Sequence, residues 1–468
     1  MKNNMYVIAV LLALPVILSA QAQQATLLAQ WDDPTIIGSA AYNNRYNEVW
    51  SVAVNGHEYA IIGSTKGTHF IDVSNPTQPF EAAFVPGKAQ GPGIIHRDYK
   101  TYKHYIYGVC DEGASSLQIM DIATLPDSVR LVSNASDIIV TTHNISIDTA
   151  KGMLYAWVFG GSDQYGYGGM SILNLANPEH PVFVKKYNNI EGFAFSHIHD
   201  GFVRNDTAYL DAGNNGFAVV DFSNPQTPKL LGTMTGYPGA GYNHSGWLSE
   251  DGQYYYMADE THGSPVKTVS VANMEDIQVV DAYNAESTPT QIPHNPLVAC
   301  QYLYVSYYYD GLQVYDVSDP ANVVRVLYYD TSTEPDGNNY KGAWGVNPFL
   351  PSGTILVADM QNGLFVFQGI GDGCTGPVSK TAVPKNSELS FKVSPQPAGD
   401  VLMLEWQGEQ ASTAQVTLLN SNMQTVLQQR LETSTMVLTL PEQLANGMYF
   451  LKVQTGLGAV VRKVLIQH

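Results

Sequence analysis

Charged residues are scarce in this chain, and positively charged residues are the scarcest. Only 14 % of the 468 residues are charged, and 23 Lys and Arg stand against 42 Asp and Glu, which gives a formal net charge of −19. A chain this acidic, with no basic stripe, repels phosphate backbones. We therefore expect no nucleic-acid partner.

Cysteine is also scarce, with three residues at Cys110, Cys300 and Cys374. An odd number cannot pair completely within one chain, and the spacing fits no zinc motif. One disulfide with one buried thiol, or three buried thiols, would both agree with the sequence. Stability is therefore expected to come mainly from packing of the 44 % of residues that are hydrophobic.

Long apolar runs are missing except at the N-terminus, where Met5 to Leu18 follow the positive Lys2. Residues 20–22 then read Ala-Gln-Ala, the pattern of a cleavage site. The run is short for a membrane span, although a retained N-terminal anchor is the alternative. We expect residues 1–22 to be a signal peptide and the mature chain to have no transmembrane span.

Turn residues and aromatics are abundant, with 41 Gly, 25 Pro and 29 Tyr, as is typical of a mostly β protein. One phrase recurs seven times: a turn glycine, an apolar strand, an Asp or Asn, and a proline turn. The copies begin at Gly67, Gly113, Gly169, Gly216, Gly263, Gly311 and Gly363. Four short β-like runs in each unit of about 50 residues predict a seven-bladed β-propeller over residues 25–368, with a solenoid as the main rival.

The two ends of this region complement each other. The seventh unit lacks an outer strand, while residues 26–31 form a strand with no partner near it in the sequence. We expect this N-terminal strand to pair with residues 363–367 and so to close the propeller without an open sheet edge. A solenoid would not need such an arrangement.

A strand that ends in Val/Ile-Asp and continues with Ser/Ala-Asn-Pro-x-x-Pro, as in residues 67–79, resembles the LVIVD repeat. The region from Ala25 to Phe367 is similar to the choice-of-anchor B family of exported propellers, which combine a common body with different surface anchors. This resemblance implies the fold and export, and it indicates no particular activity.

The C-terminal part reads as a separate module. A linker rich in Gly, Pro, Ser and Lys covers residues 369–386, and alternating strands over residues 387–468 predict a small β-sandwich. An ordinary adhesive domain is one interpretation. The module also resembles the C-terminal sorting domain of type IX secretion in Bacteroidetes-like bacteria, through residues 393–398 (Val-Ser-Pro-Gln-Pro-Ala), 444–453 (Leu-Ala-Asn-Gly-Met-Tyr-Phe-Leu-Lys-Val) and 462–466 (Arg-Lys-Val-Leu-Ile).

The resemblance to sorting domains implies a partner and a location. The partner is the type IX secretion machinery. The route leads through the periplasm to the outer cell surface or the medium. The residues that carry the sorting signal are Pro395, Pro397, Gly447, Tyr449 and Lys463.

A histidine opens the first strand of most units, and the first strand of a propeller blade lines the central channel. These residues are His96, His143, His197, His199, His244 and His294. We assign Trp50 and Trp344 to the same position in the first and seventh units. The second strand should return to the same rim and end in acids, which are Asp111, Glu112, Asp211, Asp259, Glu260, Asp310 and Asp359.

Imidazole and carboxylate groups that converge at a rim are suitable ligands for a divalent ion such as zinc, copper, iron or nickel. We expect His197 and His199, two apart on a strand, to be the best chelating pair. Two alternatives stay open. In one, the histidines recur because they form hydrogen bonds to the backbone and fix the start of the strand; in the other, they act with the acids in proton transfer.

Two classes of function agree with this pattern. We favour a surface-displayed scaffold that binds a protein, a glycan or a small ligand, with a divalent metal ion as a candidate cofactor. The alternative is a metal-dependent hydrolase, lyase or oxidoreductase that uses the same rim. The sequence assigns no catalytic residue.

Overall fold

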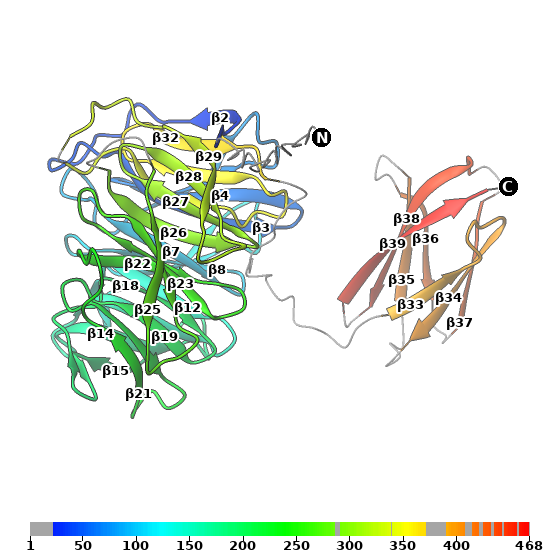
Figure 1. The fold of residues 1–468 in the computed structure, drawn as a ribbon. Helices are drawn as coiled ribbons and strands as arrows, with labels where there is room; N and C mark the ends of the chain where they lie inside the picture. Colours follow the sequence, from blue (N-terminus) through cyan, green and yellow to red (C-terminus); the bar gives the residue numbers. More distant parts are fainter. Residues whose placement is uncertain are drawn as a thin grey trace, which may run out of the picture. The chain divides into compact units, whose positions relative to one another are not determined.

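The computed structural model describes residues 22–285, 291–337, 339–370, 390–407, 414–420, 425–431, 435–441, 444–455 and 458–467. Every regular element in these ranges is a β-strand, so they contain no helix that could span a membrane. The chain divides into two compact units, Met1–Thr381 and Ala382–His468 (Figure 1). The expected signal peptide at 1–22 and linker at 369–386 lie almost entirely outside the described residues, so these boundaries stay predictions.

The described part of the larger unit contains seven sheets of four or five strands. The first sheet holds β3 (Tyr46–Val54), β4 (His57–Ser64), β5 (Gly67–Asp72) and β6 (Phe80–Pro86). The second holds β7 (Arg97–Tyr102), β8 (Tyr105–Cys110), β9 (Leu117–Asp121) and β10 (Arg130–Ala135). The third holds β11 (Ile139–Thr141), β12 (Asn144–Asp148), β13 (Met153–Gly161), β14 (Tyr167–Asn174) and β15 (Val182–Tyr187).

The next two sheets follow a short hairpin of β16 (Asn189–Ile190) and β17 (Phe193–Ala194). The fourth sheet holds β18 (Asp200–Arg204), β19 (Thr207–Asp211), β20 (Phe217–Asp221) and β21 (Lys229–Met234). The fifth holds β22 (Asn243–Leu248), β23 (Tyr254–Asp259), β24 (Val266–Ser270) and β25 (Gln278–Tyr283).

The last two sheets each include a strand from the N-terminal segment. The sixth holds β26 (Pro293–Ala299), β27 (Tyr302–Tyr307), β28 (Gly311–Asp316), β29 (Val324–Tyr329) and β1 (Gln23–Gln24). The seventh holds β30 (Ala343–Asn347), β31 (Ile355–Asp359), β32 (Gly363–Phe367) and β2 (Leu27–Trp31). The antiparallel β2–β32 pair aligns Leu27 with Phe367 and Trp31 with Leu364, which is the pairing that the sequence predicts.

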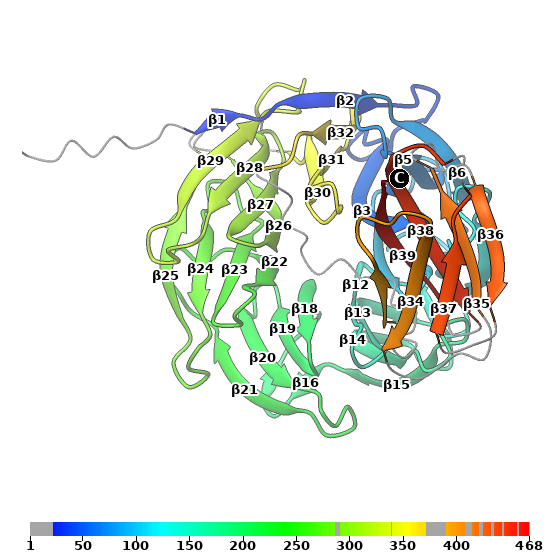
Figure 2. The ribbon, with the colours of Figure 1, turned by 90° about the vertical axis from the view of Figure 1, so that its right-hand side faces the viewer.

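The sheets are arranged around a common centre, as Figure 2 shows. Their first strands contact one another in the order β3, β7, β12, β18, β22, β26 and β30, and β30 contacts β3 again. Apolar side chains fill the space between neighbouring sheets, where Trp157 of the third sheet packs with Leu210 and Val220 of the fourth. The larger unit is therefore an all-β, propeller-like fold.

The recurring glycine of the sequence phrase is explained by its turn. Gly311 and Gly363 begin the third strand of their sheets with φ values of +68° and +89°. A Cβ atom would collide with the backbone oxygen of Tyr329 at Gly311, and with that of Trp31 at Gly363. Only glycine fits without strain at such positions. Trp31 of β2 therefore takes the place in the seventh sheet that Tyr329 of the outer strand β29 takes in the sixth.

The Asp that ends the phrase also has a local role. The Oδ1 atom of Asp72 accepts a hydrogen bond from the Ser74 backbone N–H at 2.9 Å, and Asp316 binds the Ser318 N–H in the same way at 2.9 Å. Such an Asx turn reverses the chain before the Asn-Pro or Asp-Pro segment. The residues that recur in the sequence are therefore mainly those that form these turns.

The smaller unit holds two sheets in its described part. One contains β33 (Ser390–Ser394), β34 (Val401–Gln407) and β37 (Thr435–Thr439). The other contains β35 (Ala414–Leu419), β36 (Thr425–Leu431), β38 (Gly447–Thr455) and β39 (Gly458–Ile466). Both sheets supply side chains such as Leu404 and Leu451 to one core. Of the predicted sorting residues, Gly447 and Tyr449 lie on β38 and Lys463 on β39.

The cysteines have different states. Cys300 is disulfide-bonded, whereas Cys110 is a buried free thiol. Cys374 lies outside the described residues. Of the two arrangements compatible with the sequence, the structure therefore has the one with a disulfide.

Candidate functional site

Five histidines and one tryptophan, each from a different sheet, form a closed circuit of side-chain contacts that we call the histidine ring. The ring centroids are 5.1 Å apart for Trp344–His96, 4.7 Å for His96–His143, 4.4 Å for His143–His199, 4.2 Å for His199–His244, 4.5 Å for His244–His294 and 4.9 Å for His294–Trp344. Residues far apart in the sequence meet here because every first strand begins at the same rim.

A β-bulge directs three of these side chains. The pairing register shifts at His244 between Asn243 and Ser245, and it shifts in the same way around His294 and Trp344. A bulge adds one residue to a strand and changes the direction of its side chain. The bulged residues thereby leave the regular alternation of the sheet and point into the ring.

Three of the imidazoles are held by backbone oxygens. The Nδ1 atom of His199 donates to the oxygen of His244 at 3.2 Å, and His244 donates to the oxygen of His294 at 3.2 Å. His294 donates to the oxygen of Trp344. Since Nδ1 carries the proton in each case, Nε2 carries the lone pair of the neutral ring. Burial supports this state, because it lowers the pKa of His199 and His244 well below the usual value and that of His294 to about 3.

Glu260 faces the free nitrogens of this half of the ring. Its carboxyl oxygens lie 3.9 Å from Nε2 of His244 and 3.9 Å from Nε2 of His294. Tyr308 donates a hydrogen bond to the same carboxyl at 2.7 Å, and burial raises the pKa of Glu260 to about 7. Ligand atoms of His199, His244 and Glu260 all lie within 4.8 Å of one another.

The other half of the ring contains two ion pairs. The Nδ1 atom of His143 lies 3.0 Å from Oδ2 of Asp111, and Nδ1 of His96 contacts Oε1 of Glu112. Burial alone would raise the pKa of both acids, but the histidines lower it below the usual range. Asp111 in turn raises the pKa of His143 against the effect of burial. The two halves of the ring therefore differ, because backbone oxygens hold the imidazoles of one half and carboxyl groups hold those of the other.

Four of the predicted acids do not reach the ring. Asp259 pairs with Lys267 at 2.9 Å, Asp211 accepts from the Tyr255 hydroxyl at 2.6 Å, and Asp359 accepts from Thr331 at 2.8 Å. Each of these three acids is the last residue of its strand. Successive side chains of a strand point to opposite faces, so the residue that follows the acid points the other way. In the fifth sheet that following residue is Glu260, which faces the ring.

Asp310 is the fourth of these acids, and it lies in the turn after β27 rather than on the strand. Its Oδ2 atom is buried without a hydrogen-bond partner. Burial raises the pKa of Asp310 to about 7, with Asp336 and Asp330 adding to the effect. The position that corresponds to Glu260 in this sheet is taken by Tyr308.

His197 and His199 do not form a chelating pair. Both precede β18, so the alternation of a strand does not apply to them, and their ring centroids are 6.5 Å apart. The Nε2 atom of His197 lies 2.7 Å from the Tyr242 hydroxyl. His197 belongs to neither of the two groups whose ligand atoms lie within 4.8 Å of one another, which are His96, Asp111 and His143, and His199, His244 and Glu260. Trp50 is likewise not at the ring. The matching position of the first sheet holds Asn47, which donates to the oxygen of Ile95 at 3.0 Å.

Ser64, His69 and Glu81 have the connectivity of a catalytic triad without its accessibility. His69 lies 2.8 Å from the Ser64 hydroxyl through Nε2 and 2.6 Å from Glu81 through Nδ1. Ser64 is 0 % exposed, and its oxygen already accepts from the Lys66 and Gly67 backbone N–H groups. A substrate cannot reach it, so the three side chains tie β4, β5 and β6 together.

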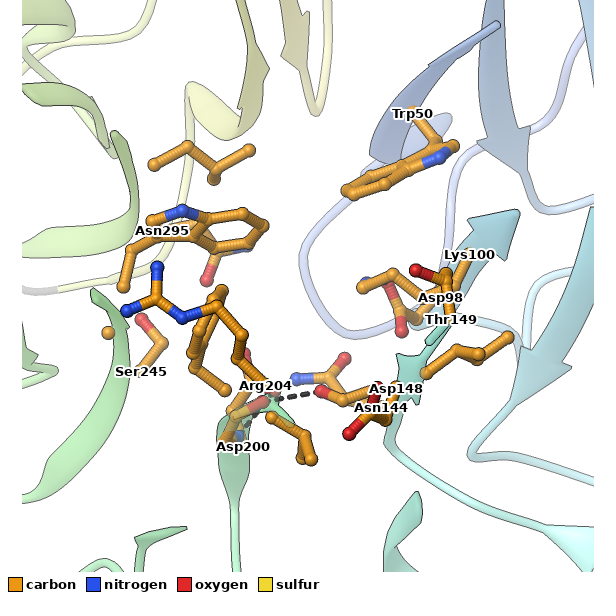
Figure 3. Close-up of a pocket in the computed structure, with 18 of the residues that line it drawn as sticks. Trp50, Asp98, Lys100, Asn144, Asp148, Thr149, Asp200, Arg204, Ser245 and Asn295 are labelled. Atoms are coloured by element: carbon orange, nitrogen blue, oxygen red, sulfur yellow. Dashed lines mark hydrogen bonds and ion pairs between the residues drawn. The ribbon is translucent and has the colours of Figure 1, made fainter. Parts of the chain in front are cut away.

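A cavity of about 360 Å³ lies along the first strands beyond the histidine ring (Figure 3). Its lining begins at the residue that follows each of four ring histidines, namely Asn144, Asp200, Ser245 and Asn295. Further along, Trp50 and Trp247 line it with Glu48, Asp98 and Lys100. This cavity could not be predicted from the sequence, because its residues are spread over many strands.

Comparison with known families identifies two parts of the chain. Residues 392–467 match the secretion system C-terminal sorting domain, and residues 48–85, 202–235 and 297–331 match the LVIVD repeat. The tail is therefore a type IX sorting domain, and the protein is exported to the cell surface or secreted. No curated protein matches this chain.

Solved structures show only distant likeness. The extracellular domain of a proposed one-component system of B. thetaiotaomicron is 12 % identical with a TM-score of 0.44; the match covers 94 % of this chain and 60 % of that one. A proposed 6-phosphogluconolactonase of Bacteroides uniformis is 12 % identical with a TM-score of 0.46, and the match covers 89 % of this chain and 100 % of that one. The chain thus spans 60 % of the length of the first of these proteins.

Proposed function

We propose that this chain is an exported, closed seven-bladed β-propeller of the choice-of-anchor B type that binds a divalent transition-metal ion in its histidine ring. The ion is held by His199, His244 and Glu260, and the propeller acts as a binding scaffold at the cell surface. The sorting tail delivers it there from the periplasm. The circuit of first strands and the β2–β32 pair support the closed ring.

The observation that carries the metal site is the orientation of the imidazoles. Each Nδ1–H of His199 and His244 is bound to a backbone oxygen, which fixes the ring and leaves Nε2 as the ligand atom. Histidine ligands of metal ions are usually oriented by such a second hydrogen bond. The ligand atoms lie within 4.8 Å of one another, so small side-chain rotations bring them within about 2 Å of one ion.

The donor set indicates the kind of ion. Two neutral imidazoles and one carboxylate suit zinc, copper, nickel or iron better than magnesium or calcium, which prefer oxygen ligands. Glu260 adds the negative charge that a divalent ion requires, and the hydrogen bond from Tyr308 holds this carboxyl in place. The ion would thereby link the fourth and fifth sheets.

The test is metal analysis of the untagged mature chain. Protein dialysed against Zn²⁺, Cu²⁺ or Ni²⁺ and then against buffer should retain one ion per chain. His244→Ala and Glu260→Gln should lose it, whereas His197→Ala, a matched control, should retain it. Circular dichroism of each variant confirms folding. A wild-type chain without metal, or a folded His244→Ala variant with full occupancy, would refute the site.

A metal-dependent enzyme is the second candidate, and the position of the cavity favours it. The cavity begins at Ser245 and Asn295, directly after two ring histidines, so a substrate there would lie next to the ion. Turnover of ester, phosphoester or hydration substrates by the metal-loaded chain, abolished in His244→Ala, would support this candidate over a scaffold without turnover.

A further inference from the structure

The cavity beyond the histidine ring is lined by more acidic side chains than basic ones. Glu48, Asp98 and Asp200 come from β3, β7 and β18 and line the same space. Lys100 pairs with Asp98 at 2.7 Å. Arg204, at the other end of the lining, donates to backbone oxygens instead. One lysine therefore faces three carboxyl groups, because Lys100 also lowers the pKa of Glu48 and of Asp200 against the effect of burial.

Glu48 and Asp200 are satisfied only by neutral donors. Glu48 accepts from the Val49 N–H at 3.0 Å and from Asn295 Nδ2 at 2.9 Å. Asp200 accepts from the Gly201 N–H at 2.7 Å, and within the described ranges no Lys or Arg forms an ion pair with it. The Oδ1 atom of Asn295 is buried without a hydrogen-bond partner. The cavity therefore presents acceptors that lack a donor.

Aromatic side chains form the remaining wall. The rings of Phe202 and Trp247 are 4.7 Å apart, and Phe349 lies 5.5 Å from Trp247 and 6.1 Å from Trp50. Figure 3 shows Trp50 on the side of the cavity opposite Ser245. Aromatic faces attract both hydrocarbon and cationic groups.

We infer that this cavity binds a small organic amine, whose ammonium group meets Asp200 and the free Oδ1 of Asn295 and whose apolar body packs on Trp50 and Trp247. An ammonium group supplies three donors and one positive charge, which are the two things that the acceptors lack. An anion would meet three acidic side chains, and a neutral sugar would supply no cation for the carboxyl groups of Glu48 and Asp200. The volume of about 360 Å³ falls in the range of small-ligand pockets.

Isothermal titration with three ligands of nearly equal shape tests this inference. The probes are 2-phenylethylamine, 2-phenylethanol and phenylacetate, each titrated into the full mature chain after EDTA dialysis. The amine should bind at least tenfold more tightly than the alcohol, and phenylacetate should not bind. Equal binding of amine and alcohol, or no binding of the amine, would overturn the inference.

Variants locate the binding. Asp200→Asn should weaken amine binding at least tenfold and leave alcohol binding unchanged, whereas Trp247→Leu should weaken both. Asp163→Asn, which makes the same charge change at an exposed position, should bind like the wild type. An unchanged amine affinity in folded Asp200→Asn would contradict the inference. Because the titrations use metal-free protein, their outcome does not depend on whether the proposed metal site exists.

Discussion

The Nδ1 atom of His199 donates to the backbone oxygen of His244, and the two imidazoles lie with their centroids 4.2 Å apart. The same link runs from His244 to His294 in the next sheet. One nitrogen of each ring thus joins neighbouring sheets while the other is free for a ligand. The structural and the ligand-binding interpretations of the repeated histidines are therefore compatible.

Substitution of His244 should separate these two roles. Glutamine retains a donor for the His294 oxygen, so His244→Gln should stay close to the wild type in stability. His244→Leu should lose about 0.5–1.5 kcal/mol, because that oxygen keeps only the Ser245 hydroxyl as a donor. Neither variant should show the rise in melting temperature that excess Zn²⁺ gives to the wild type. Thermal unfolding with and without Zn²⁺ measures both effects. A full Zn²⁺ response of His244→Gln would contradict the ligand role.

Ser64, His69 and Glu81 should contribute to stability and not to hydrolysis. His69→Leu removes the partner of two side chains and should cost about 1–3 kcal/mol in denaturant unfolding. A fluorophosphonate probe should leave Ser64 of the folded wild type unmodified, because this serine is fully buried. Labelling of Ser64 in the native protein would disprove this interpretation.

The buried ion pair of Lys267 and Asp259 should be costly to break on one side. Both side chains are 0 % exposed, so Lys267→Met would leave a buried carboxylate without a cation and should cost about 3–5 kcal/mol. The double variant Lys267→Met/Asp259→Leu should regain most of this loss. Urea unfolding of the three proteins gives the comparison. If the double variant is no more stable than Lys267→Met, the expected recovery is contradicted, and the loss of stability is due to the absence of the ion pair itself.

Glu48 should make the protein less stable as the pH rises. Burial, with a contribution from Asp98, raises the pKa of Glu48 from 4.5 to about 8. The folded chain keeps a proton that the unfolded chain releases between these values, so the free energy of unfolding falls with pH in this window. Glu48→Gln should remove this decline. The stability of the variant relative to the wild type should rise from pH 5 to pH 8 by at most about 1.4 kcal/mol per unit. A constant difference would contradict the raised pKa.

Trp31 should anchor the N-terminal strand. Its ring lies 5.9 Å from that of Tyr46 and 5.4 Å from that of His69, at the core between the first and seventh sheets. Trp31→Ala should therefore lower the free energy of unfolding by roughly 2–3 kcal/mol, less than for a fully buried tryptophan. Ile37→Ala, at a side chain that is 71 % exposed, is the control and should change little.

The fold was predictable from sequence where the causes are local. Gly311 needs a positive φ, and Asp72 needs a turn directly after it, so both kinds of residue recur in most of the units. The N-terminal strand was predictable for another reason. The seventh unit lacked an outer strand, and residues 26–31 formed a strand that had no partner near it in the sequence.

The site was less predictable because it depends on register and on the spatial order of the sheets. Asp259 and Glu260 are adjacent in sequence, yet one pairs with Lys267 between strands and the other faces the ring. Tyr308 takes part in the ring through Glu260, although a tyrosine gives no sign of this in the sequence. Asn47 occupies the position that we assigned to Trp50 from the sequence, and it could be recognised only once the bulge in β3 was known.

The pairing of β2 with β32 has a consequence for how the chain reaches its final state. The Gln30 side chain binds the backbone oxygen of Asn362, 332 positions away, so the strand made early finds its partner only after every other sheet has been produced. Contacts between such distant segments form slowly. Until β2 pairs with it, β32 is an edge strand with unpaired backbone groups, and such a strand can pair with another molecule. A strand that is made at the start of this unit therefore completes the sheet that is made last.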